Sequence, residues 1–477
     1  MASRNALRPN VLFILSDDQG PWAMRCAGNA DIITPALDRI ASAGVRFTDF
    51  FCTSPVCSPA RASLLTGEIP SRHGVHDWIR AGNMGPDRVD YLEGQPLLTD
   101  LAAAAGYRCG LVGKWHLGAS DVPRKGYVKW FAHQSGMSAY YNAPMVDERR
   151  PLTVARYLTD ELTDHALAFL RDEAPRSEPF WLSLNYTAPH YPWIDSHPRE
   201  YTDLYADCAF ASCPQEASHP LTAHGNPATD EGFRRPRESL IGYFASMTAM
   251  DAGIDRVLRG LDELGLGAST LVIFMSDNGM NCGHHGIWGK GNGTRPQNMY
   301  DTSVKVPCLF AQPGRIVPGA CDALLSAYDV FPTLVDYLGL QDSAPRRPRP
   351  GRSFLPLLTG DREIDERDVV VYDEYGPVRM VRTRQWKYVH RHPGGPHELY
   401  DLARDPGERV NLVDRAEAQS TAANLRARLQ AWFAQFADPA LDGAHKRVTG
   451  CGQLGLVPAA GDGSDVFAAD PIAPLSR

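Results

Sequence analysis

Residues 10–20, NVLFILSDDQG, join a short apolar run directly to an acidic pair. A continuous apolar run of this length is typical of a strand buried on both faces, as in a parallel sheet covered by helices. The same pattern recurs at residues 270–280, TLVIFMSDNGM. Two such strands far apart in one chain predict an α/β fold on a parallel sheet, with polar side chains at the strand ends.

Other segments extend this pattern. Further strands are expected at Cys109–Val112, Phe180–Asn185 and Pro307–Ala311. Amphipathic segments expected to be helices lie between the strands, at residues 34–44, 97–106, 154–171, 239–264 and 326–338. This alternation predicts a large, mostly parallel central sheet flanked by helices.

The C-terminal third has a different pattern. Residues 341–353, QDSAPRRPRPGRS, are rich in proline and arginine and are expected to be a linker. Strand-like segments at 368–374 and 380–391 precede a helical pattern at 416–436. We therefore expect a main domain at residues 1–345 and a smaller α+β subdomain with an antiparallel sheet, plus a tail, at 346–477. Residues 208–236 are expected to be an irregular insertion near a cleft, and residues after Gly450 a loosely packed tail.

Composition excludes several classes of protein. The chain has 477 residues, of which 43% are hydrophobic and 22% charged, so it is expected to be globular with more than one unit. A net charge of -8 argues against a nucleic-acid partner. No apolar run approaches the roughly 20 residues of a membrane span, and residues 11–15 are too short for a signal-peptide core. A cytoplasmic location without a membrane partner is expected.

Cysteine spacing argues against a zinc knuckle or a disulfide framework. The ten cysteines are irregularly spaced and include no C-x-x-C pair. A local disulfide between Cys208 and Cys213 is conceivable but not expected.

Polar side chains follow the two matched strands. Asp17 and Asp18 end the first strand, and Asp277 and Asn278 end the second. Ligand sites of open α/β sheets lie outside the carboxyl ends of the strands, so these side chains should converge if the strands are neighbours. Asp and Asn also commonly end strands without any ligand. The matched pair favours a site for a hard cation, Ca²⁺ or Mg²⁺, bound by oxygen atoms.

Cationic and imidazole groups follow other predicted elements. Lys114 and His116, in GKWHLG, would face the same way on an extended backbone and suit an anionic substrate. His190 lies in a proline-rich loop, and Lys290 lies between glycines in GKGNGT. Each of these residues could equally be a packed or solvated side chain when it is considered alone.

Residues 57–67, CSPARASLLTG, predict a short helix that begins just after Cys57. Ser58 is the expected N-cap, Pro59 the first helical residue and Gly67 the stop. Arg61 would oppose the helix dipole in the first turn and therefore needs an anionic partner. Cys57 could be a structural thiol, an activated nucleophile or a precursor of another group.

Together these motifs resemble the type I, formylglycine-dependent sulfatases of the alkaline phosphatase-like superfamily. The signature Cys-x-Pro-x-Arg, two residues, two hydrophobics, Thr and Gly matches residues 57–67 without departure. SDDQG, GKWHLG, PH, SDNG and GKGNGT occur in family order, and ELYDLARDPGERVNL resembles the family's C-terminal subdomain. The resemblance spans residues 9–413 and makes 1–345 the catalytic domain.

The resemblance implies a role for each site residue. Cys57 would be converted to formylglycine by a formylglycine-generating enzyme, and the hydrated aldehyde would be the nucleophile. One cation, Ca²⁺ or less commonly Mg²⁺, would be bound by the acidic set and by the modified residue: Asp17, Asp18, Cys57, Asp277 and Asn278. Arg61 would orient the diol, and Lys114 and Lys290 would bind sulfate oxygens. His116 would contact the formylglycine, and His190 would lie near the leaving-group oxygen.

One departure concerns the pocket wall. Many family members have an aromatic-Glu-Gly-Gly stretch after the position of Lys290, whereas this chain has NGTRPQNMYDTSVKVP. The expected substrate is a carbohydrate or aryl sulfate ester, and Trp78 and Trp193 could stack on it or simply pack. A phosphonate monoester or phosphodiester hydrolase of the same superfamily is the alternative. A non-catalytic binding module is disfavoured because no ligand position is missing.

Overall fold

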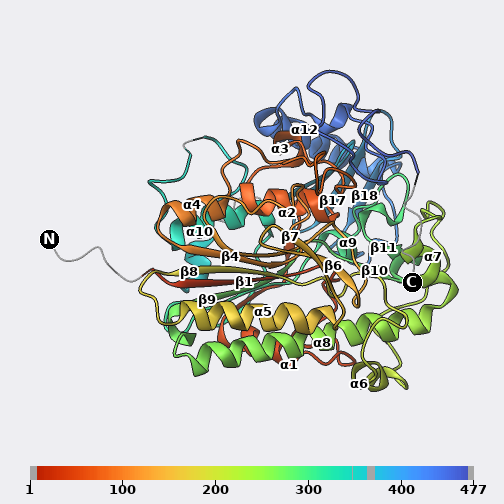
Figure 1. Cartoon of the computed structure of the whole chain (residues 1–477). Coiled ribbons are helices and arrows are strands. Elements are labelled where there is room, and N and C mark those ends of the chain that lie inside the picture. Colours follow the sequence, from red (N-terminus) through yellow and green to blue (C-terminus); the bar gives the residue numbers. More distant parts are fainter. Residues whose placement is uncertain (1–7, 346, 362–370, 471–477) are drawn as a thin grey trace.

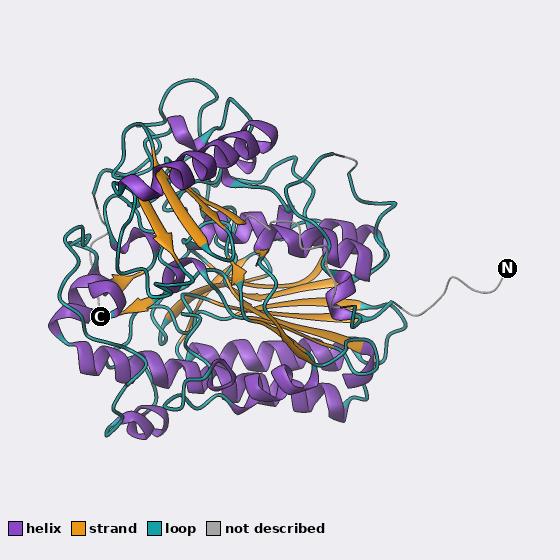
Figure 2. Ribbon diagram, turned by 180° about the vertical axis from the view of Figure 1, so that it is seen from behind, coloured by secondary structure: helices purple, strands orange, loops and turns teal. Residues whose placement is uncertain are grey.

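The computed structural model describes residues 8–345, 347–361 and 371–470. A ten-stranded sheet lies between two layers of helices (Figures 1 and 2). Its strands run in the order β13 (Gly319–Cys321), β2 (Val45–Phe47), β12 (Cys308–Ala311), β9 (Thr270–Ser276), β1 (Asn10–Ser16), β8 (Phe180–Asn185), β4 (Arg108–Gly113), β5 (Tyr127–His133), β6 (Ala143–Asp147) and β7 (Arg150–Val154).

The centre of this sheet is parallel, as the sequence predicts. Strands β9, β1, β8, β4 and β5 are neighbours, and each adjacent pair among them runs parallel. The predicted strands at 10–16, 180–185 and 270–276 have these bounds in the structure. Leu12 pairs with Leu182 on one side and Val272 on the other, so β1 lies in the middle of the parallel set.

Strand β12 runs antiparallel to β9, in contrast to its predicted direction. Cys308, which begins β12, pairs with Met275 near the end of β9. The loop that connects the two strands stays at the carboxyl edge of the sheet. Strand β12 therefore starts at the edge where β9 ends and runs in the opposite direction. The apolar run of β12 predicts a buried strand but not its direction.

Helices cover both faces of the sheet (Figure 1). One layer contains α1 (Pro35–Ala43), α5 (Leu158–Glu173) and α8 (Pro236–Glu263), and the other contains α2 (Cys57–Thr66), α4 (Leu98–Ala104) and α10 (Val330–Tyr337). Helix α5 begins four residues later than the predicted start at Val154, because Val154 pairs with Ala143 in the sheet.

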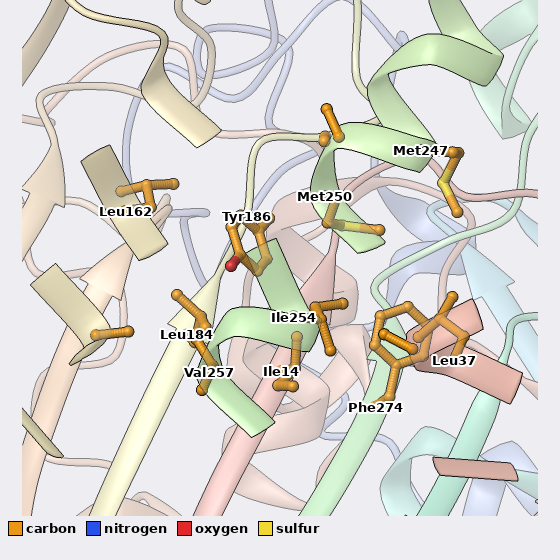
Figure 3. Close-up of a cluster of buried hydrophobic side chains, with 14 of the residues drawn as sticks. Ile14, Leu37, Leu162, Leu184, Tyr186, Met247, Met250, Ile254, Val257 and Phe274 are labelled. Carbon is orange, nitrogen blue, oxygen red and sulfur yellow. The ribbon is translucent and has the colours of Figure 1, made fainter. Parts of the chain in front are cut away.

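Apolar side chains of the central strands pack directly on the α1, α5 and α8 layer (Figure 3). Ile14, Leu184 and Phe274 come from three neighbouring strands and belong to one buried cluster with Ile254 and Met250 of α8. Each of these side chains is fully buried. Burying such a side chain stabilises the fold by about 1.5–3 kcal/mol, so this layer holds the strand ends rigidly.

A second, antiparallel sheet forms the C-terminal unit. Its strands are β15 (Val371–Tyr375), β16 (Val378–Arg382), β17 (Trp386–Arg391) and β18 (Glu398–Asp401), and α12 (Gln419–Phe436) covers them (Figure 1). This agrees with the expected antiparallel sheet. The first part of the strand predicted at 368–374 lies outside the described residues. The division of the chain at residue 345 stays a prediction.

Two segments, expected to be an irregular insertion and a loosely packed tail, are more regular or more tightly packed than predicted. Helix α7 (Pro227–Arg234) occupies the second half of the 208–236 insertion, where Asn226 accepts a hydrogen bond from the Ala228 N–H at 3.0 Å. The tail is tightly packed at its start, since Cys451 is 2% exposed and Gln453 is fully buried. Asp77 fixes the start of the tail, because its Oδ2 accepts hydrogen bonds from the N–H groups of Gly450 at 2.9 Å and Gly452 at 3.1 Å.

Short elements complete the described chain. They are β3 (Phe50–Phe51), α3 (Pro70–His73), α6 (Arg199–Thr202), β10 (Asn281–Cys282), β11 (Trp288–Gly289), α9 (Asp301–Val304), β14 (Leu325–Ser326) and α11 (Leu355–Leu358). None of the ten cysteines, all of which the structure describes, forms a disulfide. Among the described helices, none combines the length and apolar character that a membrane crossing requires.

Candidate active site

The two predicted acidic strand ends meet at one edge of the sheet. Ser16 pairs with Ser276, so the residues that follow β1 and β9 lie side by side. The Asp18 N–H donates to Asp277 Oδ1 at 3.2 Å, and the Asp277 N–H donates to the Ser16 carbonyl at 3.2 Å. The Asp18 backbone therefore orients the Asp277 side chain, and a backbone hydrogen bond joins the two strand ends.

Basic groups surround these carboxylates. Lys114 Nζ lies 2.5 Å from Asp17 Oδ2, and Lys290 Nζ pairs with Asp18 Oδ1. Burial alone would raise the pKa of Asp17, but the Lys114 ammonium, with His190 and Arg61, outweighs it and holds that pKa well below its usual range. Asp17 is therefore ionised and available as a ligand throughout the physiological pH range.

Cys57 lies among these charges at the start of α2. Its side chain is buried, and Sγ lies 2.8 Å from Lys290 Nζ, 3.4 Å from Asp17 Oδ1 and 3.8 Å from Asp18 Oδ1. Burial and the Asp17 carboxylate raise the pKa of the Cys57 thiol. The residue is thus a neutral thiol at pH 7, and the environment does not support an activated thiolate.

The predicted cap of α2 is wrong. The helix begins at Cys57 with Val56 as its N-cap, and Gly67 ends it with φ 67° as expected. Ser58 is inside the helix, where its Oγ donates to the His116 carbonyl at 2.9 Å and accepts the Ile79 N–H at 3.0 Å. Its hydroxyl joins two other loops to the helix. It therefore bonds to distant backbone groups instead of capping its own helix.

Arg61 has the anionic partner that its position requires. Its Nε donates to Asp277 Oδ2 at 3.0 Å, and Nη1 donates to the Lys114 carbonyl at 3.0 Å. The guanidinium is 2% exposed, so this ion pair is desolvated. Arg61 thereby connects α2 to the ends of β9 and β4.

The two predicted histidines occupy different positions. His190 Nε2 lies 3.5 Å from Asp18 Oδ2, and its Nδ1 donates to the Tyr191 carbonyl at 2.6 Å. His116 Nε2 donates to the Ile79 carbonyl at 2.9 Å, and its buried Nδ1 has no hydrogen-bond partner among the described residues. His116 has φ 58°, so the extended-backbone argument for it does not hold, although Lys114 and His116 line the same cavity.

The oxygen atoms at the strand ends fit a hard cation. Asn278 Oδ1 is buried and lacks a hydrogen-bond partner among the described residues, while its Nδ2 donates to Asp18 Oδ1 at 2.9 Å. Potential ligand atoms of four residues lie within 4.8 Å of one another: Asp17, Asp18, Cys57 and His190. Asp277 is not in that group, and its oxygens accept hydrogen bonds from Arg61 and from the N–H groups of Asp18 and Asn278.

A cavity of about 280 Å³ opens above Cys57. Its floor includes Asp18, Lys114 and Lys290. Its walls include residues that the motifs do not indicate: Arg80, Asn226–Thr229, Arg295, Gly450 and Cys451. They come from three loops and from the start of α7. Two of these segments had a signal in the sequence: residues 226–229 lie in the insertion expected near a cleft, and Arg295 follows the GKGNGT stretch. Trp193 is 1% exposed and packs on Trp288, and Trp78 is half-buried. Both side chains line the cavity.

This sheet and this polar edge place the chain in the alkaline phosphatase-like superfamily. A family model described as "Sulfatase" matches residues 9–340, and one described as "N-sulphoglucosamine sulphohydrolase, C-terminal" matches 283–435. The chain belongs to the sulfatase family, a family of sulfuric ester hydrolases.

Named relatives agree with that assignment. The chain is 30% identical over 456 residues to an ulvan-active sulfatase of Formosa agariphila, covering 90% of this chain and 82% of the relative. It is 30% identical over 453 residues to arylsulfatase A of Homo sapiens, covering 85% and 83%. The solved structure of a phosphonate monoester hydrolase of Agrobacterium radiobacter shows the same fold, with a TM-score of 0.70 at 23% identity, covering 93% of this chain and 99% of that one.

Proposed function

We propose that this enzyme hydrolyses a carbohydrate or aryl sulfate ester, releasing inorganic sulfate, with a formylglycine made from Cys57 as nucleophile and one divalent cation. The observation that carries the proposal is the position of Cys57 Sγ, on the cavity floor and within 4 Å of Lys290, Asp17 and Asp18. A neutral buried thiol at this point is a poor nucleophile itself, and it is well placed as the precursor of one.

The cation would be bound by the acidic set and the modified residue: Asp17, Asp18, Cys57, Asp277 and Asn278. The unpartnered Asn278 Oδ1 supports this, because a buried amide oxygen is costly unless a donor or a cation satisfies it. Oxygen ligands suit a hard cation, and the family resemblance makes Ca²⁺ the first choice, with Mg²⁺ as the alternative. When bound, the ion would supply positive charge that polarises the sulfate and stabilises negative charge in the transition state.

The hydrated aldehyde would supply two hydroxyl groups, one that forms the new S–O bond and one whose deprotonation lets the aldehyde re-form as sulfate leaves. Lys114 and Lys290 would bind sulfate oxygens, since both ammonium groups reach the cavity floor. Arg61 would fix the position of the nucleophile through α2. As the ester S–O bond breaks, His190 or Lys290 would donate a proton to the departing oxygen.

His116 is the proposed base for the second hydroxyl. Its carbonyl and ring are both held, by Ser58 and by the Ile79 carbonyl, so its orientation is fixed. Burial holds the pKa of His116 well below its usual range. The imidazole is therefore neutral near pH 7 and able to accept a proton.

Mass spectrometry and paired assays test the proposal. Protein from its native host should carry formylglycine at position 57, and Cys57→Ala should lose turnover while Cys26→Ala, a partly exposed thiol elsewhere, should not. An aryl sulfate and the matching aryl phosphonate ester should then be compared. A preference of about 100-fold for the phosphonate, about 2.7 kcal/mol, would identify the phosphonate hydrolase alternative instead. An unmodified thiol in active protein would refute the mechanism.

Maturation, location and domain roles complete the proposal. The partner during maturation would be a formylglycine-generating enzyme, and the substrate a small molecule or saccharide. Residues 1–345 would supply the catalytic groups, since every proposed site residue precedes residue 345. A cytoplasmic location stays a prediction.

A further inference from the structure

Two arginines in the cavity wall lie outside the proposed catalytic machinery. Arg80 comes from the loop after α3, and Arg295 comes from the loop after β11. Both contact Cys451 of the C-terminal segment: Arg80 Nη1 donates to its carbonyl at 3.3 Å, and Arg295 Nη2 contacts its Sγ. Two guanidinium groups from distant parts of the chain therefore converge on one residue of the wall.

The charges of these two arginines are not neutralised. Apart from Cys451, Arg80 donates to the Asp470 carbonyl at 2.7 Å, so the partners of both guanidiniums among the described residues are neutral. The cations of the floor differ, because Lys114, Lys290 and Arg61 each pair with a carboxylate. The wall therefore has an excess of positive charge that no carboxylate of the described residues pairs with.

The wall is also held in place. Gly450 O accepts hydrogen bonds from Trp78 Nε1 at 3.3 Å and from Asn292 Nδ2 at 3.3 Å. Buried Asp77 binds the N–H groups on both sides of Cys451. A fixed backbone gives the two guanidiniums a defined position, which lowers the entropy cost of binding a ligand group there.

We propose that Arg80 and Arg295 form a subsite for a second anionic group, a carboxylate or a second sulfate, on the substrate whose sulfate ester is cleaved at Cys57. The inference rests on the proposed function. A cavity of about 280 Å³ is near the lower end of small-ligand pockets and has room for a sugar-sized body between floor and wall. Guanidinium groups bind carboxylate and sulfate oxygens with paired, charge-assisted hydrogen bonds.

Matched substrate pairs test the subsite. One arm compares methyl glucoside 2-sulfate with methyl glucuronide 2-sulfate, and the other compares N-acetylglucosamine 6-sulfate with N-sulfoglucosamine 6-sulfate. The enzyme should have a measured formylglycine content. In at least one arm we expect kcat/KM to be roughly 10- to 100-fold higher for the member with two anionic groups, and that arm identifies the group as carboxylate or sulfate.

Variants separate the subsite from a structural role of the arginines. Arg80→Ala combined with Arg295→Ala should bring the anionic-to-neutral ratio of kcat/KM close to 1, and the double lysine variant should retain a ratio well above 1. Arg404→Ala, whose side chain is 89% exposed in the C-terminal unit, should leave the ratio unchanged. Thermal unfolding of each variant measures any loosening of the wall. Such loosening would lower kcat/KM for both substrates of a pair and leave their ratio unchanged.

Three results overturn the inference. If kcat/KM is equal within both pairs, or if the ratio stays high in the double alanine variant, the two arginines have only a structural role in the cavity wall. The sulfatase proposal still stands in that case. Failure to hydrolyse any of the four sulfates and an aryl sulfate, by enzyme that carries formylglycine, refutes the proposed function and the subsite together.

Discussion

Replacing Ser58 by alanine tests whether this serine caps α2 or connects it to other loops. A lost N-cap costs about 1 kcal/mol. The structure places the hydroxyl inside the helix, fully buried, between the His116 carbonyl and the Ile79 N–H. Ser58→Ala would leave both groups buried without a partner, and each such group costs roughly 1–3 kcal/mol. We therefore expect a loss of about 2–6 kcal/mol in the free energy of unfolding.

A glycine variant makes the test decisive. Glycine is nearly as good as serine at an N-cap, so capping predicts that Ser58→Gly is more stable than Ser58→Ala. Inside a helix, glycine is less stable than alanine by about 0.5–1 kcal/mol, so the observed geometry predicts the opposite order. Urea unfolding followed by circular dichroism measures both. Ser42→Ala, an exposed serine near the end of α1, is the control and should change stability by less than about 0.5 kcal/mol.

The two Ser58 variants can also show that the serine is an N-cap after all. A loss near 1 kcal/mol for Ser58→Ala, together with a glycine variant more stable than the alanine variant, would restore the capping role. The activity of Ser58→Ala should also fall, because the same hydroxyl orients His116, and kcat rather than KM should carry the change if His116 acts as the proposed base.

Three further predictions concern the nucleophile, the cation and a buried acid. Cys57→Ala should reduce turnover below detection and leave the circular dichroism spectrum unchanged; retained turnover would exclude Cys57 as the precursor of the nucleophile. EDTA should lower the melting temperature and Ca²⁺ restore it, with a stabilisation of about 4 kcal/mol at 1,000 times the Kd, whereas Asn278→Ala should respond much less; equal responses would place the ion elsewhere. Burial raises the pKa of Asp251 from 3.8 to about 7, so its contribution is fully present below about pH 4 and is lost as pH rises through 7, by up to about 4 kcal/mol. Asp251→Asn should remove this fall in the free energy of unfolding between about pH 4 and 7. The same fall in the variant would contradict the assignment of the effect to Asp251.

The strands could be predicted from the sequence because their signal is local. Residues 10–16, 180–185 and 270–276 are almost entirely buried, so every position except Asn10 and Asn185 is apolar or small, and the run has clear ends. The convergence of Asp17 and Asp277 then followed from parallel pairing alone. Arg61 needed a partner for its charge, and Asp277 at 3.0 Å supplies it.

The remaining features depend on contacts between distant parts of the chain. Ser58 has the local pattern of a cap, but its partners are 21 and 58 residues away. Asp77 binds the Gly450 N–H across 373 residues, so neither segment alone shows that the tail belongs to the cavity wall. Arg80 and Arg295 meet at Cys451 for the same reason, and no spacing rule connects them.

The burial of Cys57 also constrains the order of events during synthesis. The thiol is 2% exposed in the finished fold, behind Lys290, which follows it by 233 residues. At translation rates of about 5–20 residues per second, roughly 12–47 s pass between the synthesis of Cys57 and that of Lys290. A formylglycine-generating enzyme, as proposed, would need direct access to the peptide around Cys57, which is buried in the finished fold. On that proposal, modification and folding would compete in time, and the fraction of active molecules would be decided before the site that uses the product is complete.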